Sequence, residues 1–505
     1  MSSQQDALSS APSRGLVRAT IMLGGAQLAN VVMTIARMKV IAVMLGPVGV
    51  GVLGMYGNLM EAIAVFAGLG MNTSGVRQLA RVSGDLEQST VRRLLLLSLA
   101  AQGALAMLAV WLLRRQLAVA VFGDAARSDE VGLVGVAVFC TLLALSQTAV
   151  LQGLRHVGDL SRATTLTSII GTIVGLVAVW IKREDGLVLF LIIQPLTAAA
   201  VAFLYVRRIP TQAVPIRAAL DRYDLWRTMV KLGAVFMLAG LIANATFLVA
   251  RAIVAHEIGL AAAGFLAASW GISIQSIGFL FASMAADFYP RMTEVIAAPQ
   301  AVVRLVNDQV QLSLAIAGPV LLLLIGLAPW LIVLLYSDDF KPAAPLMQWL
   351  LVGNIFRLAS LPISLTFVAG ARMGTFVGAE VLLYALFLAL LWFGLAPLGV
   401  ESAGPAFLLA FAIYTVVLTF AARKPIGFVW QPRSLWLVCG HAALTLSVLA
   451  LSHRSPWMGA VVGICSALAS GAVGLRIVVG KSVAENRAAI FITGLFKSVG
   501  WPINR

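Results

Sequence analysis

The sequence predicts an all-α polytopic membrane protein with about fourteen transmembrane helices, in two pseudo-symmetric six-helix lobes followed by two further helices. Of the 505 residues, 60% are hydrophobic and 11% are charged, whereas soluble domains average about 45–50% and 25%. Apolar stretches of roughly 18 residues or more recur along the chain, and a stretch of that length can cross a bilayer as a helix. These observations exclude a soluble globular protein.

The first six apolar stretches predict an N-terminal lobe at 19–206, after a polar tail at 1–18. They lie at 19–45, 49–76, 94–113, 131–153, 161–181 and 187–206. The first stretch is long and has no small-residue cleavage site, so we expect a retained helix and not a signal peptide.

The second half of the chain repeats this organisation after a polar linker at 207–227, which contains Pro210 and Pro215. Six stretches predict a C-terminal lobe at 228–422, and two more predict helices 13 and 14 at 434–479. They lie at 228–251, 258–287, 310–336, 344–369, 374–395, 402–422, 434–452 and 457–479. Residues 480–505 mix apolar and basic side chains, which predicts a cytoplasmic amphipathic tail at the membrane surface.

A weak long-range repeat supports two related lobes. Asn30 and Arg37 in the first stretch recur as Asn244 and Arg251 in the seventh, seven residues apart in both cases. Transporters are commonly built from duplicated helix bundles with the substrate site between the copies. An even number of helices per repeat predicts that both lobes face the same way across the membrane.

The charge distribution predicts the orientation. The chain carries 36 Lys and Arg against 21 Asp and Glu, a balance that would suggest nucleic-acid binding in a soluble protein. Here 24 of the bases fall in tails and connections on the side of the N-terminus and 8 on the opposite side. Basic loops stay in the cytoplasm. We therefore expect a multi-pass membrane protein with both termini cytoplasmic, and no nucleic-acid partner.

Polar side chains recur at helical spacing within several of the predicted spans. Small and hydroxylated residues on one face are often helix-packing contacts, so for serine and threonine stripes packing is the first interpretation. The amides are candidates for lining a polar cavity; they are Gln27, Asn30, Asn58, Asn244 and Asn354.

Charged residues inside the spans are the stronger signal, because an ionised side chain at a helix centre costs about 2.5–3.5 kcal/mol on insertion scales. Glu61 and Asp287 are candidates for ion coupling, and a structural ion pair is the alternative for Glu61. Four bases are candidates for binding a pyrophosphate or an acidic sugar: Arg37, Lys39, Arg251 and Arg357. For those near a helix end, extension of the side chain to the lipid headgroups is the alternative.

Enzyme motifs are absent from the sequence. The three cysteines, Cys140, Cys439 and Cys465, lie apart in apolar stretches, and the four histidines show no metal-ligand spacing. We therefore expect a transporter with no catalytic residue, metal or cofactor.

Several segments together resemble a known family. They are Lys39 to Gly51, Gly68-Leu69-Gly70, Gln152 to Gly158, Phe288 to Glu294, and Trp349 to Asn354 with Glu380 downstream. Together they resemble Wzx-type flippases of O-antigen and other lipid-linked oligosaccharides, in the multidrug/oligosaccharidyl-lipid/polysaccharide exporter superfamily. The resemblance spans about residues 15 to 425.

The resemblance implies a central cavity that alternates between inward-open and outward-open states. The cargo would be an undecaprenyl-diphosphate-linked oligosaccharide, moved from the cytoplasmic to the periplasmic leaflet. Lys39, Arg251 and Arg357 match positions where the family tends to carry a base, whereas Asn354 stands where many relatives carry an acid. Membrane lipids, a polysaccharide polymerase and a chain-length regulator are the other implied partners.

Two alternatives remain at this stage. One is a multidrug or organic-cation antiporter of the same superfamily, which needs intramembrane acids, whereas here bases outnumber acids. The other is a membrane-embedded polysaccharide polymerase or ligase, against which stand the repeat and the lack of a long external loop.

Overall fold

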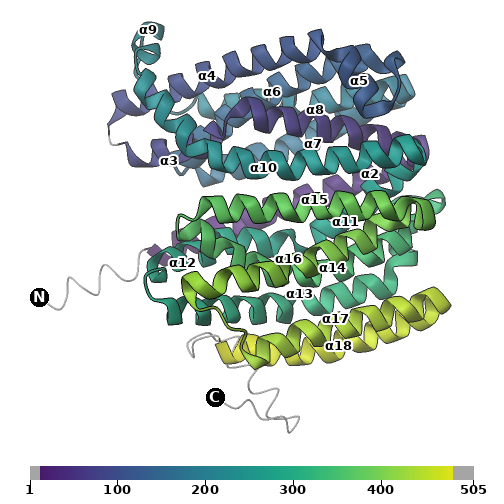
Figure 1. Ribbon diagram of the computed structural model, residues 1–505. Helices are drawn as coiled ribbons and strands as arrows, with labels where there is room; N and C mark the ends of the chain where they lie inside the picture. Colours follow the sequence, from purple (N-terminus) through teal and green to yellow (C-terminus); the bar gives the residue numbers. More distant parts are fainter. Residues whose placement is uncertain (1–11, 83, 482–505) are drawn as a thin grey trace, which may run out of the picture. The chain divides into compact units, whose positions relative to one another are not determined.

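The computed structural model describes residues 12–82 and 84–481, and all the regular structure in this part of the chain is helical (Figure 1). The helices pack into two compact units, Met1–Gly264 (unit 1) and Phe265–Arg505 (unit 2). The tail helix expected at 480–505 lies almost wholly outside the described residues, and the lobe boundaries expected at 207–227 remain a prediction.

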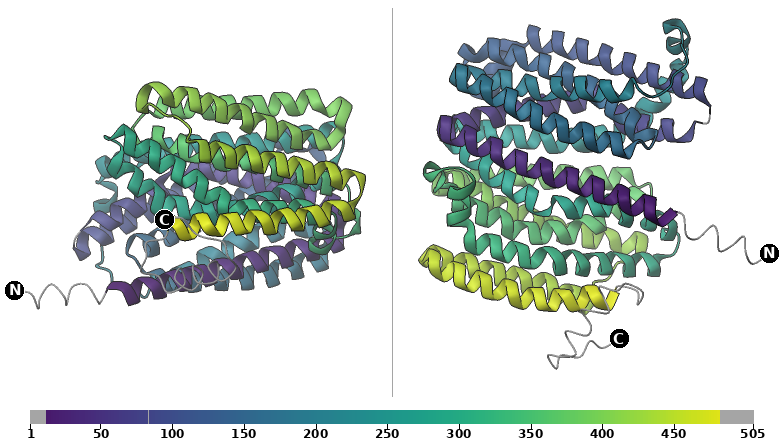
Figure 2. Two further views of the ribbon diagram at one scale, coloured as in Figure 1. Left: turned by 90° about the horizontal axis from the view of Figure 1, so that it is seen from below. Right: turned by 180° about the vertical axis from the view of Figure 1, so that it is seen from behind.

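Unit 1 begins with the long helix α2, which spans Pro12–Gly68 and is broken at Gly46. Gly46 has φ +62° and ψ −163°, and Pro47 follows it without an N–H to donate to the previous turn. The proline also disfavours the helical region for the residue before it. One continuous segment therefore contains two membrane helices (Figure 2).

The other long helices of unit 1 correspond to the third to seventh predicted spans. They are α4 (Asp85–Leu112), α6 (Ser128–Gly153), α7 (Val157–Lys182), α8 (Gly186–Val206) and α10 (Tyr223–Glu257). Short helices connect them: α3 (Met71–Arg81), α5 (Arg114–Phe122), η1 (Ala125–Arg127), η2 (Arg183–Asp185) and α9 (Ile216–Leu220). Helix α6 is central, because it packs against α4, α8, α3 and α2.

Unit 2 holds the remaining long helices, with the first turn of α11 in unit 1. They are α11 (Leu260–Ser283), α13 (Pro299–Leu335), α14 (Ala343–Ala369), α15 (Met373–Leu398), α16 (Ala403–Ile426), α17 (Pro432–Arg454) and α18 (Pro456–Lys481). The short elements are η3 (Met284–Phe288), α12 (Tyr289–Val295), η4 (Asp338–Phe340) and η5 (Gly399–Ser402). Helices α17 and α18 lie side by side, and both pack against α13.

Fourteen long helices in the described residues confirm the predicted fold class. Ten stretches are apolar and long enough to cross a membrane, and three of these contain two helices each. Helix α10 is a further helix of 35 residues. The outer faces carry large apolar side chains such as Trp436 and Phe393, which are 78% and 77% exposed. Such faces suit contact with lipid tails.

The clearest difference from the sequence-based expectation is the second span, expected to run to residue 76. It ends at Gly68, and Leu69 and Gly70 both have positive φ, at 49° and 66°. The chain turns there into the separate amphipathic helix α3. Apolar content alone did not reveal this break, because a single leucine between two glycines keeps the segment apolar.

Candidate functional site

A cavity of about 370 Å³ lies inside unit 1, between α2, α3, α4, α6 and α10. Glu61 from α2 and Asn244 from α10 both line it, so the structure brings together two residues that the sequence marked as candidates. Glu61 is exposed to solvent. A carboxyl group in the middle of a membrane helix therefore faces an accessible polar space and not the lipid.

Helix α10 runs antiparallel to the second part of α2, so Arg251 lies about two turns beyond the cavity-lining Asn244. A guanidinium nitrogen of Arg251 donates to the carbonyl oxygen of Gly54 at 2.7 Å. Arg251 also interacts electrostatically with Glu61. Earlier in α10, the Asn244 amide donates to the carbonyl oxygen of Gly240 at 3.0 Å. These two helices therefore supply an acid and an amide to the cavity wall, with a base about two turns away on α10.

The turn after α2 approaches α10 closely at Gly70 and Gly233. A Cβ atom added to Gly70 would lie 2.2 Å from the carbonyl oxygen of Gly233, and one added to Gly233 would lie 2.4 Å from that of Leu69. Real Cβ atoms do not come this near to a backbone oxygen. Gly70 also has φ +66°, a backbone angle that residues with a Cβ atom rarely adopt. The absence of a Cβ atom at both positions therefore allows the turn after α2 to pack directly against the backbone of α10.

The other predicted residues of α2 do not line this cavity. Asn30, Arg37 and Lys39 lie in the first part of α2 and are half-buried. Asn58 lies in the second part, and its amide nitrogen is buried without a hydrogen-bond partner among the described residues. The backbone of Gln27 belongs to α2, but its side chain lies outside the described part. Their predicted roles remain predictions.

Arg357 occupies a distinct environment in unit 2. Its guanidinium carbon lies 4.8 Å from the ring centre of Phe281 and 5.7 Å from that of Phe411. Arg357 also interacts electrostatically with Glu380 and Tyr384, both on α15. The hydroxyl of Tyr414 donates to Glu380 at 2.6 Å. This base therefore sits between aromatic rings, close to an internal acid.

The last two candidates are engaged in local contacts. Asn354 is fully buried, and its amide donates to the backbone and hydroxyl oxygens of Ser273, both at 3.0 Å. Asp287 is exposed in η3, and its carboxylate pairs with Arg291 one turn later at 2.9 Å. These contacts place Asn354 in the packing between α11 and α14, and Asp287 in a surface ion pair.

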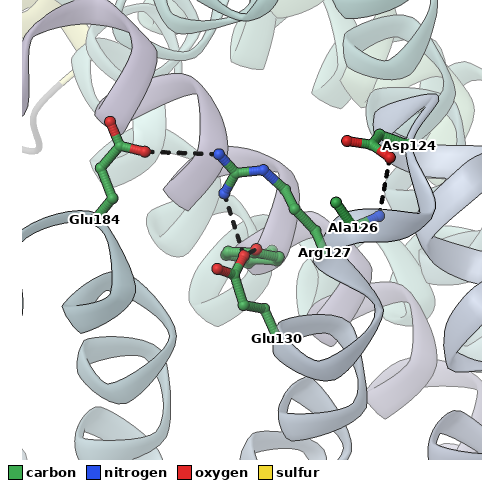
Figure 3. A network of polar contacts seen from close by, with 6 residues as sticks. Asp124, Ala126, Arg127, Glu130 and Glu184 are labelled. Carbon is green, nitrogen blue, oxygen red and sulfur yellow. Dashed lines mark hydrogen bonds and ion pairs between the residues drawn. The ribbon is translucent and has the colours of Figure 1, made fainter.

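One polar network in unit 1 was not among the predictions (Figure 3). Arg127 pairs with Glu130 at 3.1 Å and with Glu184 at 3.6 Å, and the Tyr56 hydroxyl donates to Glu130. The three-residue spacing of Arg127 and Glu130 could have indicated their ion pair. Nothing in the sequence pattern links them to Glu184 or Tyr56, which reach the site from η2 and α2. The network ties three segments together at one end of unit 1.

The described side chains offer no cluster of three or more His, Cys, Asp or Glu that could hold a metal ion. These side chains are the usual metal ligands of proteins, so the structure gives no candidate metal centre of this kind within the described ranges.

Comparison with known proteins gives a consistent picture. A model of the polysaccharide biosynthesis protein family matches residues 40–345, more than half of the chain. The lipid III flippases of Escherichia coli (strain K12) and Shigella flexneri are each 21% identical over 409 residues, which cover 78% of the chain and 94% of each flippase.

Solved structures share the fold. The lipid II flippase MurJ in an inward closed conformation aligns with a TM-score of 0.64 and 12% identity, over 91% of the chain and 100% of that protein. An inward-facing multidrug resistance transporter of the MATE family, in the MOP superfamily, aligns with a TM-score of 0.62 and 14% identity, over 79% of the chain and 94% of its own. These alignments show that the chain has the fold of these transporters.

Proposed function

The chain belongs to the polysaccharide biosynthesis protein family, and from this membership we propose that it is a flippase for lipid-linked oligosaccharides. The observation that carries the proposal is the alignment with lipid III flippases over 94% of their length. The shared fold with a lipid II flippase agrees with it. The cargo is an undecaprenyl-diphosphate-linked repeat unit of O-antigen or another surface polysaccharide, moved from the cytoplasmic to the periplasmic leaflet of the inner membrane.

The physical problem for such a cargo is its polar head. Burying an uncompensated sugar hydroxyl in hydrocarbon costs several kcal/mol, and a diphosphate costs far more. A protein that offers a hydrated cavity replaces the lost water contacts, while the polyprenyl tail stays among the lipid tails. The accessible cavity of unit 1 supports this function. If the cavity opened alternately to the two sides of the membrane, the polar head of the lipid would be carried across the bilayer.

Basic side chains are proposed to bind the diphosphate. Arg251 supports this best, because it lies about two turns from the cavity-lining Asn244 on the same helix and its planar fork suits two phosphate oxygens at once. Arg357 is proposed as a second contact, held in place by its aromatic neighbours. Arg37 and Lys39 complete the proposed set. A polymerase and a chain-length regulator would use the product on the periplasmic side.

The experiment is reconstitution into liposomes with a fluorescent polyprenyl-diphosphate sugar on one leaflet. We expect protein-dependent loss of the probe from that leaflet, with Arg251→Ala and Arg357→Ala both slowing it at least tenfold. Lys341→Ala is the control, because the Lys341 side chain is exposed and pairs with the equally exposed Asp338 three residues earlier, at 2.9 Å. Extrusion of ethidium without lipid movement would instead identify a cation exporter and contradict the proposal.

A further inference from the structure

Beside the cavity of unit 1 lies a second one of about 170 Å³, between α3 and α6. Asn72, Thr73 and Leu145 line both cavities, so the two adjoin. The second cavity adds Thr148 and Gln152, which lie on α6 at the spacing that keeps them on one face with Thr141 and Leu145. The two cavities therefore lie next to each other along α6, separated by shared lining residues.

Uncharged hydrogen-bonding groups dominate the polar lining of these two cavities. We call this set the polar tract: Asn72, Thr73, Thr141, Thr148, Gln152 and Asn244. Glu61, at the end near Arg251, is the charged residue among the described lining residues, and the second cavity has none. An ionised ligand group in the second cavity would therefore have no counter-charge in its lining.

The donors and acceptors of the polar tract match sugar hydroxyls. Thr141 donates to the carbonyl oxygen of Ala137 at 2.7 Å, and Thr148 to that of Ala144 at 3.0 Å. The hydroxyl oxygens of both threonines then remain as acceptors. The amides of Asn72 and Gln152 can each donate and accept. A sugar hydroxyl also does both, whereas a lipid tail could satisfy none of the donors and acceptors that remain open on these side chains.

We propose that the polar tract binds the uncharged sugar rings of the lipid-linked oligosaccharide, with the glycan extending along α6 from the Glu61 end to Gln152. This inference rests on the proposed function. It assigns the recognition of neutral sugars to amides and threonines of unit 1, separately from the basic residues that would hold the diphosphate.

The test compares two probes in the liposome assay: a polyprenyl diphosphate carrying one N-acetylglucosamine, and the same lipid carrying a neutral trisaccharide. Thr148→Val and Gln152→Leu each remove hydrogen-bonding capacity at similar volume. We expect each to slow the trisaccharide lipid about three- to tenfold relative to the single-sugar lipid, since one hydrogen bond to the longer glycan is lost.

Two variants serve as controls. Thr148→Ser keeps the hydroxyl and should keep the parent ratio between the probes. Thr165→Val should also keep it, because Thr165 makes the same kind of bond to a carbonyl one turn earlier, that of Ser161 at 2.9 Å, but lies on α7 away from both cavities.

Three outcomes would contradict the inference. If Thr148→Val and Gln152→Leu slow both probes equally, the polar tract does not contact the added sugars, although the flippase function stands. If the parent moves a trisaccharide ending in a uronic acid faster than the neutral one, the bound sugars are anionic. If the parent moves neither lipid, the proposed function fails together with the inference.

Discussion

Glu61 and Arg251 show how opposite charges can persist inside a membrane bundle. They lie on neighbouring helices and interact electrostatically, and Glu61 lines a cavity. A charged group that faces an accessible cavity avoids most of the cost of burial in lipid. This arrangement is compatible with a structural pair and with ion coupling, so the two have to be separated by experiment.

We expect Glu61→Gln to uncouple transport from the ion gradient. Glutamine keeps the size of the side chain but cannot release a proton or hold a cation by charge. The measurement is lipid translocation in proteoliposomes with and without ionophores that collapse the proton or sodium gradient. Glu257→Gln, at the exposed end of α10, should behave as the parent. Retained gradient dependence with lowered thermal stability would show instead that Glu61 serves only the pair with Arg251.

Arg357 allows a second prediction at this scale, since its guanidinium stacks between Phe281 and Phe411. Lysine keeps the charge but not the planar stack, and a desolvated cation–π contact contributes about 2 kcal/mol against about 0.5–1 at exposed sites. We expect Arg357→Lys to lower the thermal midpoint of the purified protein. Arg423→Lys is the matched control, because Arg423 stacks on the exposed Phe420 at 4.4 Å. Equal shifts in both variants would argue against the buried stack.

At the scale of elements, α17 and α18 are an integral part of unit 2. Helix α18 approaches α13 through glycines: a Cβ on Gly463 would lie 2.9 Å from the Cα of Gly326, and one on Gly474 would lie 2.2 Å from the carbonyl oxygen of Ala315. Small residues let membrane helices approach closely enough for extensive van der Waals contact. Helix α18 therefore packs closely against α13 and belongs to the same bundle.

We expect Gly474→Ala to destabilise the protein by about 1–3 kcal/mol, the usual cost of forcing an atom into a packed contact. Gly471→Ala lies three residues away on the same helix, where a Cβ meets only the ring of Pro319 at 3.9 Å, and should be neutral. The measurement is the thermal midpoint of both variants at equal detergent and lipid. A neutral Gly474→Ala would mean that α18 shifts without loss and is only loosely docked.

Element boundaries show how far apolar patterning can be trusted. Most predicted spans agree with the structure within a few residues, for example 131–153 against Ser128–Gly153. Helix α13 begins at Pro299, eleven residues before the expected start at 310. Its first turns carry polar residues such as Arg304 and Asp308, so an apolar window misses them. Hydropathy locates the lipid-crossing part of a helix, whereas hydrogen bonding of the backbone determines where the helix ends.

At the scale of the whole molecule, the excess of basic residues on one side predicts that both termini are cytoplasmic. To test this, the three cysteines are replaced by serine and single cysteines are introduced at exposed positions. We expect Asp185→Cys to react with a membrane-impermeant maleimide in intact spheroplasts, and Arg217→Cys to react only after the membrane is permeabilised. The reverse pattern would invert the predicted orientation.

The sequence by itself determined the class of the protein and most of its helices, because the hydrophobic effect and the bilayer thickness act on local composition. It also identified Glu61, Asn244 and Arg251 as unusual, since intramembrane polar groups are rare enough to stand out one at a time. Only the tertiary structure decided that Glu61 and Asn244 line one cavity, that Arg251 bonds to Gly54 on the neighbouring helix, and that Arg357 lies between aromatic rings near Glu380. It also showed that threonine and amide side chains of α3 and α6 line a second cavity next to the first. Such groupings depend on which helices pack together, and helix packing is set by shape along whole faces, which short motifs and hydropathy do not encode.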